Sequence, residues 1–361
     1  MAHVAILTPS LTSGDAVSND VLGMQAALQA RGHHAAVFSD WVVPAEGAKH
    51  IGEIGELLSD PSALLIYHHA VGWDAGYKLL SEALCKRVVK YHNVTPPEFF
   101  EGINDLYKQT CEKGIRQLTR VVSLGCDVYL SDSEFNMKEI VAQGADAARC
   151  HVVAPFNQID RLSTLDEDAG IVDLYQDGLV NILTVGRIVP NKGHRLLIDA
   201  FGLYHEHFRP DSRLIIVGGM DERLDAYTVS LMDRVSTLGL SDAVLFTGQV
   251  SDNALKAYYL AAHVFAITSM HEGFCVPLVE AMAMKLPIVA LGSTAIPGTV
   301  GGAGIVWSEP DPWLVAGSFD AVTRDKQVAV SLGLMGWHRY RDAFTRDKIE
   351  SRFLDSVATQ L

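Results

Sequence analysis

The stretch SMHEGFCVPLVEAMA at residues 269–283 carries the strongest structural signal in the chain. It follows an apolar run over 264–267 that predicts a buried strand, and its glycine loop leads to Pro277, a residue common at the start of a helix. The free N–H groups of such a helix start form a ready anion site. Glu272 in the loop and Glu280 in the helix can accept hydrogen bonds from sugar hydroxyls. For either glutamate alone, a solvated charge or a favourable contact with the helix dipole is the plainer interpretation.

The run VGRIVPNKG at residues 185–193 predicts a second loop of this kind. A predicted strand delivers Arg187 and Lys192 to this loop, and Gly186 and Gly193 frame it. Two fixed cations beside a helix start can neutralise a departing diphosphate without a metal ion. The alternative is a pair of solvated surface cations, and the glycine framing argues against it.

Apolar, β-rich runs alternate with helical patterns along nearly the whole chain, which is typical of parallel α/β sheets. One set of predicted strands comprises residues 4–8, 35–38, 64–67, 87–90 and 128–130, and a second set comprises 181–185, 213–217, 244–247, 264–267 and 288–291. Two doubly wound sheets in series would bind ligands in a crevice at the carboxyl ends of their strands.

The length of 361 residues predicts two domains, because single cores rarely grow so large. We expect the first over residues 1–157 and the second over 158–338. The polar, acidic stretch 157–178 is interpreted as the linker between them. The tail 339–361 predicts one helix with an apolar face.

Composition excludes several classes of function. The formal net charge of −14 argues against a nucleic-acid partner, because phosphate binding favours a basic surface. The five cysteines are scattered without a C-x-x-C pair, which fits reduced thiols in a cytosol better than a disulfide framework. The first residues lack a secretory signal and no apolar run is long enough to span a membrane, so we expect a cytoplasmic protein.

Together these runs resemble the family 4 glycosyltransferases of the GT-B fold, through G-R-x4-K-G at 186–193 and E-G-F-x5-E at 272–280. The resemblance implies an α/β chain of two Rossmann-like, doubly wound parallel-sheet domains facing across a cleft. The first binds the acceptor and the second binds a nucleotide-sugar donor, and the last helix crosses back to the first domain. The activity implied is transfer of a sugar from a nucleotide diphosphate with retention of configuration, forming an α-linkage.

The resemblance also assigns roles to residues. Arg187 and Lys192 would bind the donor diphosphate, Glu272 the transferred sugar and Glu280 the ribose. The donor-binding set in the second domain is Gly186, Arg187, Lys192, Gly273, Phe274, Cys275, Val276 and Glu280.

The first half has a glycine loop, SGDAVSND, at residues 13–20. Members of the family often have two glycines there, facing the donor phosphates. This chain has Gly14 followed by Asp15, so we expect Gly14 beside the donor and Asp15 to serve the acceptor. The G-x-G-x-x-G motif of a dinucleotide-binding dehydrogenase is absent.

Three histidines follow predicted strands. His92 matches a histidine that the family places beside the donor sugar, where a neutral imidazole could bind a hydroxyl and support developing positive charge. The alternative is that it only caps its own strand. His68 and His69 are expected to line the pocket, with acceptor contact as the weaker interpretation. The catalytic set is therefore His92, Glu272, Arg187 and Lys192.

No metal or other cofactor is expected. The D-x-D spelling at 166–168 lies in the predicted linker, and no histidine or cysteine cluster has ligand spacing.

Residues 91–100 resemble bacterial enzymes of surface-polysaccharide biosynthesis, so GDP-mannose is the first expectation for the donor, with glucose or another hexose next. The acceptor would be a glycan or a polyprenyl-diphosphate-linked saccharide. A nucleotide-sugar 2-epimerase and a non-catalytic sugar-nucleotide binding protein remain alternatives on the same fold.

The segment 86–120 is locally cationic, with seven Lys and Arg against four Asp and Glu. Its cations are interleaved with apolar and aromatic residues, which predicts a peripheral contact with an anionic membrane on the cytoplasmic face. An ordinary solvated helix whose apolar side faces the core is the alternative.

Overall fold

The computed structural model describes residues 1–12, 14–41 and 47–361 in two compact units. Unit 1 comprises Met1–Glu98, Leu106–Gln158 and Thr345–Leu361, and unit 2 comprises Phe99–Asp105 and Ile159–Phe344. Ser13, the first residue of the glycine loop 13–20, lies outside the described residues.

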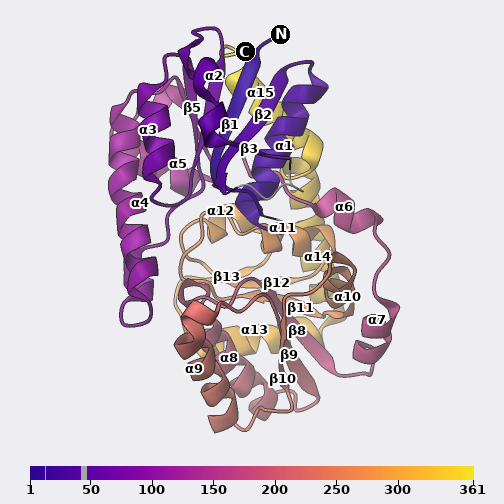
Figure 1. The fold of residues 1–361 in the computed structure, drawn as a ribbon. Helices are drawn as coiled ribbons and strands as arrows, with labels where there is room; N and C mark the ends of the chain where they lie inside the picture. The colour runs from indigo at the N-terminus through magenta and orange to yellow at the C-terminus, as the bar shows by residue number, and fades with distance from the viewer. Residues whose placement is uncertain (13, 42–46) are drawn as a thin grey trace. The chain divides into compact units, whose positions relative to one another are not determined.

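Unit 1 is built on a seven-stranded parallel sheet with the order β3-β2-β1-β4-β5-β6-β7 (Figure 1). Its strands are β1 (His3–Ser10), β2 (His34–Trp41), β3 (Lys49–His50), β4 (Leu64–His69), β5 (Lys86–Tyr91), β6 (Val128–Ser131) and β7 (Cys150–Val152). Its helices are α1 (Ala16–Ala30), η2 (Ile51–Glu53), α2 (Gly55–Ser59), α3 (Asp74–Glu82), α4 (Asp105–Ser123), α5 (Glu134–Ala142), η4 (Ala147–Arg149) and α15 (Arg346–Val357). The winding reverses between β1 and β4, so the carboxyl ends of these two strands form a switch point where ligands bind in such sheets.

Unit 2 is built on a six-stranded parallel sheet with the order β10-β9-β8-β11-β12-β13. Its strands are β8 (Val180–Val185), β9 (Ser212–Val217), β10 (Val244–Gly248), β11 (Val264–Ile267), β12 (Ile288–Leu291) and β13 (Ile305–Trp307). Its helices are α6 (Ile159–Thr164), α7 (Ala169–Tyr175), η5 (Pro190–Lys192), α8 (His194–His207), η6 (Glu222–Leu224), α9 (Asp225–Thr237), α10 (Asp252–Ala261), α11 (Val276–Ala283), α12 (Ile296–Val300), α13 (Pro312–Arg324) and α14 (Lys326–Ala343). The short helix η3 (Pro97–Phe100) spans the point where the chain passes from unit 1 to unit 2.

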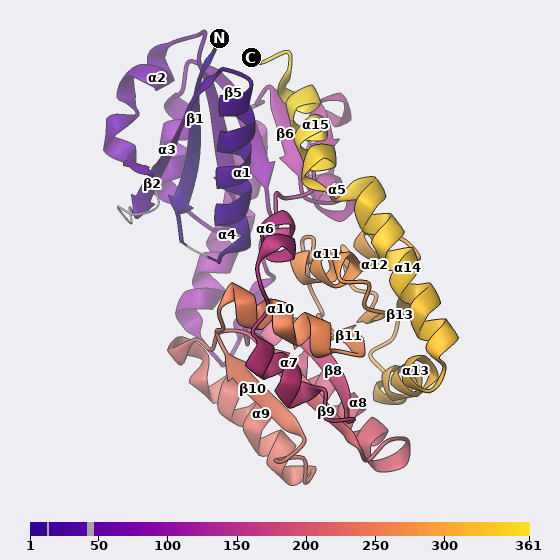
Figure 2. The ribbon, with the colours of Figure 1, turned by 90° about the vertical axis from the view of Figure 1, so that its right-hand side faces the viewer.

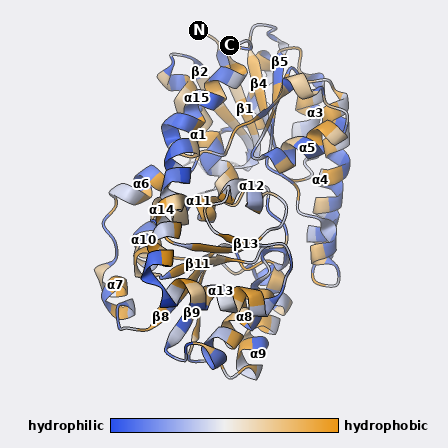
Figure 3. Ribbon diagram, turned by 180° about the vertical axis from the view of Figure 1, so that it is seen from behind, coloured by the Kyte–Doolittle hydropathy of each residue, from blue (hydrophilic) through white to orange (hydrophobic). Residues whose placement is uncertain are grey.

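Both sheets consist mainly of hydrophobic strands, as expected where helices cover both faces (Figure 3). In unit 1, β4 is buried along its whole length. In unit 2, the core between α8, α13 and the sheet is centred on Phe201, Tyr204 and Phe319, none of which is exposed. Two parallel sheets of seven and six strands confirm the predicted α/β class.

The C-terminal tail differs from the single predicted helix. Helix α14 ends in unit 2 and α15 begins at Arg346 in unit 1, where it packs on α1 and β6 (Figure 2). The backbone is extended at Thr345 (φ −64°, ψ 153°), which ends the helical hydrogen bonding. On either side, Phe344 packs edge-on against Phe274 and Phe353 against Phe156. The apolar pattern is therefore shared between two cores, and the last helix belongs to the first unit.

The acidic stretch 157–178 is not an irregular linker, because it forms α6 and α7, which pack on α10. Asp168 caps α7 by accepting a hydrogen bond from the Ile171 backbone N–H. Lys256 of α10 donates hydrogen bonds to backbone carbonyls of this stretch. Helix capping and side-chain hydrogen bonds therefore stabilise these two helices, although their sequence has no regular apolar periodicity.

Candidate active site

Three loops meet at the carboxyl ends of β8, β9 and β11 in unit 2, and glycines allow their approach. A Cβ atom on Gly218 would lie 1.9 Å from the carbonyl oxygen of Gly186, and one on Gly193 would lie 2.0 Å from that of Thr268. Gly193 also has a φ of +66°, which favours glycine. The glycine framing read from the sequence therefore reflects close backbone contact.

Hydrogen bonds lock the loop after β8 to the loop after β11. Asn191 is buried, its carbonyl accepts from the Met270 N–H at 2.8 Å, and its side-chain amide donates to the His271 carbonyl at 3.1 Å. The Thr268 hydroxyl donates to the Gly193 carbonyl at 3.0 Å. The side chains carried by these two loops are consequently held in a fixed frame.

Lys192 and Glu272 face each other across this frame. The ammonium donates to both carboxylate oxygens, at 2.7 and 2.9 Å. The Glu272 side chain is 8% exposed and that of Lys192 is 20% exposed. The hydroxyl of Thr294 accepts a hydrogen bond from the Glu272 N–H at 2.8 Å and so fixes its backbone. Both predicted ligand groups thus have a partner in this structure.

Arg187 differs from Lys192. Its side chain is exposed, and among the described residues none forms a hydrogen bond or ion pair with it. A planar guanidinium at the rim of the loop can bind two oxygens of a phosphate at once.

The start of α11 presents backbone N–H groups. Cys275 adopts a left-handed conformation (φ 77°, ψ 76°) at the N-cap, and no described side chain caps the helix. Gly273, Phe274 and Val276 form the same turn, so backbone N–H groups without a side-chain cap, the kind of group that binds anions, lie at this helix start. Burial raises the pKa of the Cys275 thiol well above its usual value, which disfavours the reactive thiolate form.

Glu280 lies one helical turn further along α11. It accepts a 2.7 Å hydrogen bond from the hydroxyl of Tyr259 in α10. Burial raises the pKa of Glu280, and the hydrogen bond from Tyr259 partly offsets this. A half-buried carboxylate that accepts from one tyrosine can also accept a hydrogen bond from a ligand hydroxyl.

In unit 1, the glycine loop leads directly into α1. Gly14 has a φ of +79° and open space around it. Asp15 is the N-cap of α1, and its carboxylate accepts from the Ser18 N–H at 3.0 Å and the Ser18 hydroxyl at 3.1 Å. Its first role is therefore structural, which competes with the acceptor role expected from the sequence.

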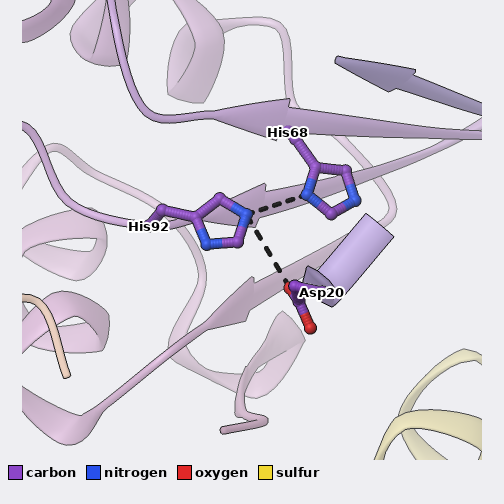
Figure 4. A group of neighbouring side chains, drawn as sticks. All are labelled: Asp20, His68 and His92. Atoms are coloured by element: carbon purple, nitrogen blue, oxygen red, sulfur yellow. Dashed lines mark hydrogen bonds and ion pairs between the residues drawn. The ribbon is translucent and has the colours of Figure 1, made fainter. Parts of the chain in front are cut away.

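His68, His92 and Asp20 converge near the switch point of the unit 1 sheet (Figure 4). His68 Nδ1 lies 2.8 Å from His92 Nε2, which is 3.7 Å from Asp20 Oδ2. His92 Nδ1 lies 3.0 Å from Asp132 Oδ2, just past β6. His69 alternates to the other face of β4, where its Nε2 lies 3.0 Å from the Gly114 carbonyl of α4.

Lys90 ties this group together from within β5. Its side chain is fully buried, with Nζ 2.7 Å from Asp132 Oδ1 and 3.7 Å from Asp20 Oδ2. Burial raises the pKa of Asp20, and the charges of Lys90 and His92 partly oppose this rise. We call Asp20, His68, Lys90, His92 and Asp132 the His92 cluster.

Comparison with known proteins assigns the second unit. Residues 175–326 match the model of a family described as "Glycosyl transferases group 1". Residues 175–326 therefore form a glycosyltransferase group 1 domain. This domain contains Arg187, Lys192, Glu272 and Glu280, the four residues brought together at the carboxyl ends of its strands or on the helix that follows.

Curated relatives share this domain. Mannosylfructose-phosphate synthase of Agrobacterium fabrum is 31% identical over 175 residues, covering 47% of this chain and 38% of the relative. A GDP-mannose-dependent α-(1-6)-phosphatidylinositol monomannoside mannosyltransferase of Mycolicibacterium smegmatis is 27% identical over 235 residues, covering 62% and 60%. The chain thus spans between 38% and 60% of the length of these two relatives.

Solved structures match the whole chain. Anabaena HepE in complex with UDP-glucose has a TM-score of 0.78 at 17% identity and covers 99% of this chain and 100% of its own. Sucrose-phosphate synthase from Thermosynechococcus elongatus has a TM-score of 0.78 at 18% identity, with 99% coverage of both. The glycosyltransferase group 1 domain therefore lies in a chain with the GT-B fold, as the resemblance implies.

The spacing of motifs in the sequence did not predict the His92 cluster, because its members come from separate helices, strands and loops. Asp20, His68 and His92 are the one group among the described residues whose ligand atoms converge closely enough to hold a metal ion. The 2.8 Å contact between two imidazoles is a hydrogen-bond distance, and the Lys90 ammonium opposes a second cation. The donor set therefore fits an internal network better than a metal site. The one available signal was Lys90, which directly follows the apolar pair Val88 and Val89 in β5.

The cationic segment 86–120 contains α4, an amphipathic helix. Its buried side includes Leu118, while Leu106 and Ile115 are exposed. Lys113 pairs with Asp74 at 2.6 Å, and Phe100 is buried and offers no aromatic surface. No helix in the described part of the chain is long and apolar enough to cross a membrane.

Proposed function

We propose that the chain is a retaining, metal-independent hexosyltransferase that moves a sugar from a nucleoside diphosphate onto a glycan or lipid-linked saccharide. The observation that carries the proposal is the Lys192–Glu272 pair beside the uncapped start of α11. It combines a cation, an anion site and a carboxylate for sugar hydroxyls in one fixed frame. These are the three features that a nucleotide-sugar donor requires.

The pair supports an exchange of partners on binding. A diphosphate oxygen takes the Lys192 ammonium, and Arg187 joins it from the rim of the loop. Glu272 then accepts a hydrogen bond from a hydroxyl of the transferred sugar, and Glu280 accepts one from the ribose. In this proposal the acceptor attacks from the face that the diphosphate leaves, and a leaving phosphate oxygen takes the acceptor's proton.

GDP-mannose is the first candidate donor. The names of two relatives support it, a GDP-mannose-dependent mannosyltransferase and a mannosylfructose-phosphate synthase. Other hexoses on GDP or UDP are the next candidates.

The test is a screen of GDP-mannose, GDP-glucose and UDP-glucose in saturating EDTA, with thermal shift for binding and an acceptor panel for turnover. We expect one donor to raise the melting temperature and to be consumed only with acceptor. Product formation without acceptor would indicate a 2-epimerase. Binding without turnover would indicate a sugar-nucleotide binding protein. Activity lost in EDTA and restored by manganese would overturn metal independence.

A peripheral membrane contact would serve a lipid-linked acceptor. Exposed Leu106 and Ile115 on α4 support it, whereas the pairing of Lys113 with Asp74 reduces the free positive charge. In liposome flotation we expect binding to anionic but not neutral vesicles, weakened by salt and by Ile115→Asp. Protein that stays at the bottom with every lipid mixture would point to a soluble acceptor.

A further inference from the structure

We infer that Asp132 and His68 are positioning residues for His92, one at each ring nitrogen, and that a hydroxyl of the sugar substrate replaces His68 at Nε2. The first part concerns the free protein. The second part rests on the proposed function.

Asp132 determines which nitrogen of His92 carries the proton. Its Oδ2 lies 3.0 Å from Nδ1, and its Oδ1 lies 2.7 Å from Lys90 Nζ. Burial would raise the pKa of Asp132, but the charges and hydrogen bonds of His92 and Lys90 outweigh it and lower the pKa. An ionised carboxylate can only accept hydrogen bonds. Nδ1 of His92 therefore donates.

His68 occupies the other nitrogen. Its Nδ1 lies 2.8 Å from His92 Nε2, and the two rings are stacked 21° apart with centroids at 5.0 Å. Burial lowers the pKa of His68 well below its usual value and the charge of Lys90 lowers it further, so His68 is neutral. The lone pair on His92 Nε2 then accepts the Nδ1–H of His68, as it would accept a hydroxyl donor.

His68 is a partner that a ligand can displace from His92 Nε2. Its own Nε2 is buried and has no hydrogen-bond partner in the described part of the chain, a cost that a purely structural histidine would avoid. His69, one residue later, shows the structural arrangement, with both ring nitrogens near partners on its own face. The contrast separates a histidine that holds the fold from one that holds His92.

The surroundings fix the imidazole in one orientation. The Lys90 and Asp20 side chains are completely buried and that of His92 is 5% exposed. Only one edge of the His92 imidazole is therefore accessible to a ligand. The cluster lies at the carboxyl ends of β4, β5 and β6, beside the switch point where such sheets bind ligands. A buried charged network of this kind holds a ligand-binding side chain in place.

The tautomer is measured directly from ring ¹⁵N shifts in histidine-labelled protein, with His92→Gln identifying the His92 signals. In the wild type we expect a proton on Nδ1 and a lone pair on Nε2. Asp132→Asn should move much of the proton to Nε2. The matched control is Asp127→Asn at the amino end of β6, whose carboxylate accepts from the Arg87 N–H, and it should leave His92 unchanged. An unaltered tautomer in Asp132→Asn would overturn the assignment.

Asp132→Asn removes the partner of a buried lysine and could prevent folding, so His68→Phe provides a second route. It keeps a ring and removes the donor. We expect the Nε2 resonance of His92 to shift while Nδ1 stays protonated, and an unshifted Nε2 resonance would refute the role of His68.

Kinetics test the exchange with substrate. Asp132→Asn should lower kcat at least about tenfold with little change in the donor KM, because a wrong tautomer cannot accept the hydroxyl. Displacement itself is tested in the wild type, where saturating donor should shift the His92 Nε2 resonance while Nδ1 stays protonated, because the substrate hydroxyl replaces the Nδ1–H of His68. A His92 Nε2 resonance that saturating donor leaves unmoved would overturn the displacement. A wild type that transfers no sugar would count against the proposed function alone and leave the tautomer result standing.

Discussion

The ammonium of Lys192 donates to both carboxylate oxygens of Glu272, at 2.7 and 2.9 Å, and so joins the loop after β8 to the loop after β11. The residues expected to hold the diphosphate and the sugar are thus each other's partners in the free chain. A donor must exchange this contact for two new ones. In the free chain the ion pair gives each of the two charged groups a partner. A ligand that carries both a phosphate and a hydroxyl can replace both partners at once.

Arg187→Ala and Lys192→Ala should each lower turnover by at least about a hundredfold, through lost stabilisation of the departing diphosphate. The two variants should differ in stability. Lys192→Ala leaves the buried Glu272 carboxylate unpaired and should lower the melting temperature, whereas exposed Arg187 is removed without such a cost. Arg195→Ala, an exposed arginine on α8, is the control for both assays. Near-normal rates in both variants would show that the diphosphate binds elsewhere.

The two glutamates should separate in calorimetry with the free nucleoside diphosphate. Glu280→Gln should weaken binding, because the ribose contact is common to donor and free nucleotide. Glu272→Gln should leave this affinity intact or raise it, because Lys192 is released from its ion pair, while turnover and sugar choice suffer. Equal losses in the two variants would contradict these roles.

Sequence reasoning succeeded where the signal is local. The loops at 186–193 and 269–276 each follow an apolar strand and carry glycine or proline at positions that geometry demands, so strand, loop and helix start could be predicted. The Lys192–Glu272 contact could not, since it depends on Gly193 packing against the carbonyl of Thr268.

Longer-range features were harder still. The His92 cluster gathers side chains from α1, β4, β5 and the loop after β6, and only the strand order brings them together. The C-terminal periodicity was continuous, yet Phe344 and Phe353 enter different cores, and only the tertiary structure separates α14 from α15. Apolar periodicity predicts an apolar face of a helix, but it does not indicate which hydrophobic core that face packs against.

Buried neutral histidines should make the fold sensitive to acid. Burial lowers the pKa of His69 to about 4 and that of His194 to about 3. Because the unfolded chain takes up these protons first, stability present above about pH 6.5 falls as the pH drops toward the folded values. Urea unfolding at pH 7.5, 6 and 5 should show this decline. His194→Gln should make the decline shallower, whereas exposed His338→Gln should not, and identical slopes in all three proteins would disprove the assignment.

Gly193 offers the sharpest test of the loop frame, because a matched glycine exists in the same unit. Gly193 and Gly239 have nearly the same left-handed backbone, with φ of +66° and +68°. An added Cβ at Gly239 meets nothing within 4 Å, whereas at Gly193 it would lie 2.0 Å from the Thr268 carbonyl oxygen.

Gly239→Ala therefore carries only the backbone cost, about 1–2 kcal/mol, and should leave nucleotide affinity unchanged. Gly193→Ala carries the same cost and must also push apart the two loops that hold Lys192 and Glu272. We expect a larger loss of unfolding free energy in urea and at least about tenfold weaker nucleoside diphosphate binding. If both variants lose the same stability and bind equally well, the loops do not need their close approach, and the fixed frame proposed for the donor would have to be abandoned.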